Sequence, residues 1–177
     1  MPTRKRLLVT AIGTDRTGIV ERLTKAIVEN SGNVEQSRMA RLGGEFAAFL
    51  LVAAPDDRAA ALTDAMAKLA DATLSVTTRH IADRSTLLEG YVPYELEIQG
   101  ADHEGIIHEF CHLLAEKGIN IAEMSTDVRP SPISGTPMFS MAATLEIPAA
   151  VSTKSLKSWL NEIADKMVVD YTLRVDA

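Results

Sequence analysis

Two stretches of the chain carry the same pattern and decide the fold. Residues 12–40 read IGTDRTGIVERLTKAIVENSGNVEQSRMA, and residues 99–127 read QGADHEGIIHEFCHLLAEKGINIAEMSTD, an offset of 87 residues. Both begin with a turn that contains two glycines and an aspartate, continue with apolar residues at helical spacing, and reach an asparagine at the same position. A match of this length and order predicts two homologous halves.

A second pair of blocks extends the repeat. EFAAFLLVAAP, from Glu45, aligns with MFSMAATLEIP, from Met138, at an offset of 93 residues. The second copy therefore has six additional residues, which we place near residues 130–135. Prolines and a glycine make that segment a natural loop.

Each half predicts the element order β-α-β-β-α-β. In the second half, Tyr94, Leu96 and Ile98 alternate with polar residues, which is typical of a half-buried strand. The other predicted elements there are a helix from Ile106 that ends near Gly118, strands at 121–128, 139–147 and 169–175, and a helix that follows Ser152 as N-cap. The first half predicts strands at 6–13, 34–42, 45–53 and 74–81 and helices at 18–30 and 57–70. This order is typical of a ferredoxin-like α+β fold, with antiparallel sheets whose helices cover one face and leave the other free to meet another domain or subunit.

The expected organisation is one domain at residues 1–84, a linker at 85–92 and a second domain at 93–177. The composition, 46% hydrophobic and 24% charged, is ordinary for a soluble globular protein. A net charge of −6 argues against direct binding to nucleic acid. No apolar run is long enough to cross a membrane, and the N-terminus lacks a secretory pattern. A single cysteine suits a reducing cytoplasm.

The turn that joins the first strand to the first helix is the candidate binding site. Backbone N–H groups at a helix start are unpaired and attract anions such as a carboxylate, and glycine lets a ligand approach the backbone closely. The alternative is that the aspartate caps the helix and the glycine merely permits a tight turn. Repetition of the turn in register, together with Asn33 and Asn120 at the head of the next strand, favours the ligand interpretation, because asparagine offers both donors and an acceptor.

Two such units resemble tandem ACT domains, over about residues 5–81 and 93–176. The likeness is to the glycine cleavage system transcriptional repressor family, and the segment from Ser134 to Phe139 strengthens it. The resemblance implies a regulatory protein that is not an enzyme and needs no cofactor. It also implies binding of a small amino acid, with glycine and serine as first candidates, at interfaces between ACT domains. Transcription would be controlled indirectly, through a protein partner such as a transcription factor.

By position, the resemblance carries the ligand site onto fourteen residues. They are Asp15, Arg16, Thr17, Gly18, Ile19, Asn33 and Val34 in the first half, and Asp102, His103, Glu104, Gly105, Ile106, Asn120 and Ile121 in the second. The turn amides would hold the carboxylate, the asparagine the polar head, and the apolar residues the ligand side chain. Because the halves differ at Arg16-Thr17 and His103-Glu104, the two sites differ in specificity or only one binds.

The sequence gives less support for a metal site or a catalytic nucleophile. His108 and His112 lie four residues apart on a predicted helix, near His103 and Cys111, but zinc sites normally need three or four protein ligands. At about 100° per residue the two histidines point to the flank and Cys111 points to the core, so we expect neither a metal site nor a nucleophile. Two other functions stay open: a regulatory subunit of an amino-acid metabolic enzyme, and a ligand-free dimerisation module. Exposed strand edges and the free sheet face predict a homodimer.

Overall fold

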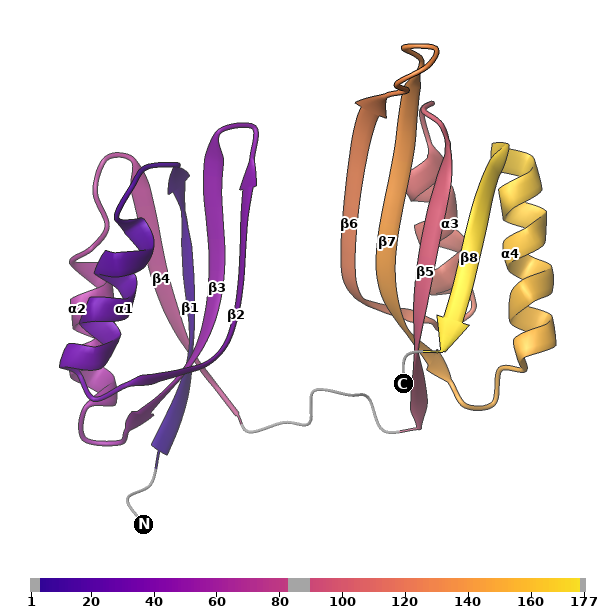
Figure 1. The fold of residues 1–177 in the computed structure, drawn as a ribbon. Helices are drawn as coiled ribbons and strands as arrows, with labels where there is room; N and C mark the ends of the chain where they lie inside the picture. The colour runs from indigo at the N-terminus through magenta and orange to yellow at the C-terminus, as the bar shows by residue number, and fades with distance from the viewer. Residues whose placement is uncertain (1–3, 83–89, 176–177) are drawn as a thin grey trace. The chain divides into compact units, whose positions relative to one another are not determined.

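The computed structural model describes residues 4–82 and 90–175, which form two compact units, here called domain 1 and domain 2 (Figure 1). Most of the predicted linker, residues 85–92, lies outside the described residues. Its last two residues, Tyr91 and Val92, belong to the first strand of domain 2.

Domain 1 has the predicted β-α-β-β-α-β order. Its elements are β1 (Arg4–Thr14), α1 (Ile19–Glu29), β2 (Asn33–Leu42), β3 (Glu45–Pro55), α2 (Ala59–Ala67) and β4 (Leu74–Ile81). The sheet order is β2-β3-β1-β4, and every neighbouring pair is antiparallel. Both helices lie against one face of this sheet (Figure 1).

Domain 2 repeats this topology. Its elements are β5 (Tyr91–Ala101), α3 (Ile106–Glu116), β6 (Asn120–Pro130), β7 (Pro137–Pro148), α4 (Thr153–Met167) and β8 (Val169–Val175), in a sheet of order β6-β7-β5-β8. The six additional residues lie where the sequence places them. The β6–β7 loop spans residues 131–136 where domain 1 has only Gly43 and Gly44, and each strand of the hairpin is one residue longer. The predicted α+β fold with two ferredoxin-like units is confirmed.

Each domain has its own core, built from alternate residues of the sheet and one stripe of each helix. In domain 1, Leu7 and Val9 of β1 are fully buried with Leu23 and Ile27 of α1. Burying one such side chain stabilises the fold by roughly 1.5–3 kcal/mol relative to leaving it exposed.

The buried stripe of α3 differs from the predicted one by one residue. Ile106, Phe110 and Leu114 face the core, whereas Ile107 is 38% exposed and Cys111 is only half-buried. The prediction that Cys111 points to the core was wrong on this point. Residue 106 is the first helical residue and packs against the sheet, which rotates the helix and brings Cys111 partly to the surface.

Two glycines fix where each turn begins. A Cβ atom at Gly13 would collide with the carbonyl oxygen of Thr73, and one at Gly100 would lie 2.6 Å from Cγ1 of Val169. The first strand of each domain therefore passes against the start of the last strand with no room for a side chain. This close approach positions the turn that follows.

Candidate functional site

The predicted turns have the same backbone in both domains. Gly18 has φ 94° and Gly105 has φ 95°, in the left-handed region that favours glycine. Among the residues described, no side chain caps the first turn of α1 or α3, so the aspartate of the turn does not cap the helix. The uncapped N–H groups lie at the positive end of each helix, as an anion site requires.

In domain 1 an arginine joins the turn to the segment that precedes the last strand. The Arg16 guanidinium forms an ion pair with Asp71, which lies between α2 and β4. Thr73 donates to Asp71 Oδ1 from its backbone nitrogen and from its hydroxyl, each at 2.9 Å. The backbone hydrogen bond from Thr73 and the Arg16 guanidinium hold the pKa of Asp71 well below its usual range. Arg16 is thus engaged within the domain.

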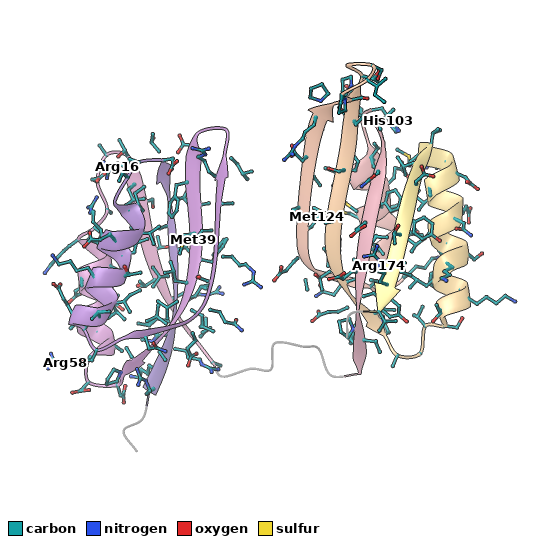
Figure 2. The ribbon with its side chains drawn as sticks, in the orientation of Figure 1. Arg16, Met39, Arg58, His103, Met124 and Arg174 are labelled. Carbon is teal, nitrogen blue, oxygen red and sulfur yellow. The ribbon has the colours of Figure 1, made fainter. Side chains whose placement is uncertain are left out.

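In domain 2 a histidine takes the place of this arginine. His103 Nε2 lies 2.8 Å from the carbonyl oxygen of Met167, the last residue of α4, and Nδ1 lies 3.0 Å from the carbonyl oxygen of Glu104. Hydrogen bonds to the Met167 and Glu104 carbonyls raise the pKa of His103 above 6.5, and the nearby Asp102 adds to the effect. Figure 2 labels Arg16 and His103, each at the same end of its own domain.

A groove of about 600 Å³ borders the turn of domain 2. Its walls are the turn itself, the start of α3 and the end of β6, and its lining residues are Asp102, His103, Gly105, Ile106, Ile107, His108, Thr126, Asp127, Val128 and Phe139. Four of the seven ligand residues predicted for the second half therefore line one groove. The sequence reasoning missed the β6 side of this groove, because strands adjacent in space are distant in the chain.

The two repeats differ across this groove. Arg41 lies opposite Phe46 on the neighbouring strand, as Val128 lies opposite Phe139, so Arg41 and Val128 are equivalent. In domain 1, Arg41 Nη1 is 3.5 Å from Asp15 Oδ2, and this ion pair spans the position of the groove. Valine cannot form such a pair in domain 2.

The asparagines open their strands as predicted, but at the far end of each sheet. Asn33 lies opposite Ala53 and Ala53 opposite Arg6, whereas the turn follows Thr14, eight residues further along β1. At about 3.3 Å per residue this is a separation of roughly 26 Å. Domain 2 has the same geometry, because Asn120 lies opposite Glu146 and Glu146 opposite Pro93. Within a single domain, one amino acid therefore cannot touch both the turn and the asparagine.

The two asparagines have different neighbours. Asn120 Nδ2 donates to Glu146 Oε2 at 2.5 Å. Glu146 is 3% exposed, the one fully buried charged side chain among the residues described. At the equivalent position Asn33 faces Ala53. The amide of Asn120 is therefore already engaged inside its domain.

The remaining predicted residues divide into core and surface. Ile19 and Ile106 are each 2% exposed and belong to the cores, so their side chains pack inward, although Ile106 borders the groove of domain 2. Val34 and Ile121 are half-buried and pack against the same cores. Thr17 and Glu104 are exposed on their turns.

The two histidines of α3 lie side by side on the helix. The rings of His108 and His112 stack with centroids 5.9 Å apart, and His112 Nε2 lies 3.6 Å from Glu116 Oε1. Within residues 4–82 and 90–175, no three His, Cys, Asp or Glu side chains are grouped to hold a metal ion. None of the helices in these ranges is long and apolar enough to span a membrane.

The sheet faces opposite the helices differ in character. In domain 1 this outer face exposes Ile12 and Phe49, and Phe49 lies beside Arg38 on β2. In domain 2 the equivalent face is mainly polar and acidic, with Glu95, Glu97, Glu123, Asp127 and Asp170. The face that the sequence predicts to be free is therefore mixed polar and apolar in domain 1 and mainly polar in domain 2.

Comparison with known proteins agrees with this architecture. An ACT-domain family profile matches residues 5–79. The glycine cleavage system transcriptional repressor of Escherichia coli (strain K12) is 27% identical over 176 residues, 94% of this chain and 91% of that protein. The crystal structure of an unknown protein from Galdieria sulphuraria is 30% identical and superposes with a TM-score of 0.82, covering 99% of this chain and all of the other. A crystal structure of a proposed glycine cleavage system transcriptional repressor, 20% identical, shares the fold with a TM-score of 0.69 over 98% of each chain.

Domain 1 matches the ACT-domain family over nearly its whole length, and domain 2 repeats its topology. Along nearly its whole length the chain resembles the glycine cleavage system transcriptional repressors.

Proposed function

We propose that this protein senses a small amino acid and controls transcription indirectly, through a protein partner, without catalysing a reaction. The observation that carries the proposal is the duplicated, uncapped glycine turn in a chain that matches the E. coli repressor over 91% of that protein's length. Glycine and serine are the first candidate ligands. The cytoplasm, where transcription factors act, is the proposed location.

The groove of domain 2 is the proposed ligand site. The N–H groups after Gly105 would hold the carboxylate, and the carboxylate of Asp102 would hold the ammonium group. Val128 and the exposed part of Ile107 would contact the ligand side chain. Domain 1 is the weaker candidate, because the Asp15–Arg41 ion pair spans the equivalent position.

An asparagine can reach the same ligand only from another ACT domain, and we place that domain in a second copy of the chain. Asn33 is the better candidate, because the amide of Asn120 is engaged by Glu146. A homodimer agrees with the exposed Ile12 and Phe49 on the outer face of domain 1.

The partner would be a protein that itself binds DNA. The net charge of −6 and the acidic outer face of domain 2 do not suit direct contact with a phosphate backbone. The ligand would act by linkage: it favours the arrangement that it binds better, and a coupling of about 1–3 kcal/mol suffices for a useful response.

Isothermal titration calorimetry with glycine, serine and a panel of other amino acids tests the ligand site. Val128→Arg should abolish binding, because an arginine there can pair with Asp102 as Arg41 pairs with Asp15. Thr63→Ala, an exchange on α2 of the other domain, is the matched control and should leave binding unchanged. Equal affinity in the wild type and in Val128→Arg would exclude this groove as the site.

A further inference from the structure

We propose that His103 is a proton-dependent latch on the turn of domain 2, whereas Arg16 is a permanent latch on the turn of domain 1. The latch is defined as the contact from the turn to the region where the second helix ends and the last strand begins. Its effect on ligand binding rests on the proposed function, but the latch itself does not.

The argument begins with the acceptors that face the imidazole. Nε2 lies 2.8 Å from the Met167 carbonyl oxygen and Nδ1 lies 3.0 Å from the Glu104 carbonyl oxygen. A carbonyl oxygen only accepts hydrogen bonds, so both ring nitrogens must carry a hydrogen. Neutral histidine has one N–H, and only the imidazolium has two. Loss of the proton therefore breaks one of the two bonds and leaves a nitrogen lone pair facing a carbonyl oxygen.

The acidic groups around the His103 ring also favour the protonated imidazolium. Asp102 on the turn lines the same groove as His103 and attracts a cation. Asp127 on β6 also borders this groove, but its carboxylate is paired with Arg129 at 2.5 Å. The Met167 carbonyl belongs to the C-terminal end of α4, the negative end of the helix dipole.

Two basic groups act in the opposite direction. His108 of α3 lines the same groove and repels the imidazolium when it is itself protonated. Lys166 precedes Met167 on α4, but its ammonium group lies 2.7 Å from Glu109 Oε2. Asp165 of α4 and Asp170 of β8 flank the Met167 end of these elements, and both are acidic. The other charged residues of the two elements lie further along them: Lys154, Lys157 and Glu162 in the preceding turns of α4, and Arg174 near the end of β8.

The first repeat shows the same latch without a titrating group. Arg16 occupies the position of His103 and pairs with Asp71, just before β4. Arginine keeps its charge at every physiological pH. The Asp71 carboxylate also stays charged into acid, because its pKa is lowered. The contact in domain 1 is therefore independent of pH over the range in which histidine titrates.

The sign of the effect follows from the direction of the pKa shift. The pKa of His103 is higher in the folded protein than its ordinary value of 6.5. The stability that the latch contributes is therefore fully present below pH 6.5 and is lost as pH rises through the folded-state pKa. The turn of domain 2 is therefore held by both hydrogen bonds of His103 at low pH and by only one of them at high pH.

Two measurements on the ligand-free full-length protein test the latch. In ¹⁵N NMR spectra, both ring nitrogens of His103 should be protonated at pH 6, with a pKa above 6.5. Hydrogen exchange, corrected for its intrinsic pH dependence, should become several-fold faster around residues 102–106 between pH 6 and pH 8.5. Residues 15–19 should show no such change, and they serve as the internal control.

Variants separate the latch from other histidines. His103→Arg should abolish the pH dependence, and His103→Gln should leave the turn of domain 2 fast-exchanging at both pH values. His108→Gln, on the same groove, should keep the wild-type response. A His103 pKa at or below 6.5, or corrected exchange that is equal at both pH values, would overturn the proposal. Because these measurements use no ligand, failure of the amino-acid proposal would leave their result unaffected.

Discussion

Arg41 Nη1 lies 3.5 Å from Asp15 Oδ2 and joins the end of β2 to the turn before α1. Domain 2 has Val128 at the equivalent position and an open groove in place of the ion pair. The two repeats thus share a backbone but differ in whether the region beside the turn is bridged.

Removal of the Asp15–Arg41 ion pair should make the turn of domain 1 as accessible as the turn of domain 2. Arg41→Val should expose the turn of domain 1 and raise the number of amino acids bound per chain in calorimetry. The free energy of unfolding should change by less than about 1 kcal/mol, because exposed ion pairs contribute little. An unchanged number of bound amino acids per chain would show that the ion pair does not cause the difference in binding between the two repeats.

Gly13 and Gly100 should differ in their tolerance of alanine. A Cβ at Gly13 meets backbone atoms of Thr73 and Leu74, whereas one at Gly100 first meets the side chain of Val169. Overpacking of this kind costs about 1–3 kcal/mol, and a rigid backbone relaxes less than a side chain. Urea denaturation should therefore show Gly13→Ala to be the more destabilising; the reverse order would contradict the close approach described.

Asn120 should stabilise domain 2 through Glu146. Asn120→Ala removes a hydrogen-bond donor from a buried carboxylate, which should cost about 1–3 kcal/mol or more in the free energy of unfolding. Asn33→Ala in domain 1, which faces Ala53, is the matched control and should cost much less. Adding Glu146→Ala to Asn120→Ala should recover most of the loss, since no buried carboxylate is then left without its donor. Similar losses for both asparagines would contradict this role.

The outer face of domain 1 should mediate self-association. Phe49→Asp places a charge on an exposed apolar position of that face and should convert a dimer to a monomer in light scattering. Ile133→Asp, in the β6–β7 loop, is the control and should leave the mass unchanged. A monomeric wild-type protein would refute the homodimer itself.

The fold could be predicted from the sequence because the repeat is local. Helical spacing and strand alternation lie within short segments, and the order of elements in each half, the loop insertion at 131–136 and the asparagines opening β2 and β6 all followed from them. The side of α3 that is buried could not be predicted in this way. Ile106 and Ile107 are both apolar, and only packing against the sheet decides which of them faces the core.

The site was harder to predict because it depends on how strands run past one another. β1 and β2 are both antiparallel to β3, so the end of β1 and the start of β2 lie at opposite ends of the sheet. This separates each asparagine from its turn. The engagement of His103 by Met167 and of Asn120 by Glu146 joins residues 64 and 26 positions apart, which no local pattern reveals.

The most direct test of amino-acid sensing is an NMR titration of the full-length protein with glycine and with serine. The account predicts saturable shifts of the backbone amides of residues 103–107 and of Val128, which are absent from the Val128→Arg variant. Spectra that do not change with either amino acid or with the rest of the panel, or shifts confined to residues outside the groove, would contradict it.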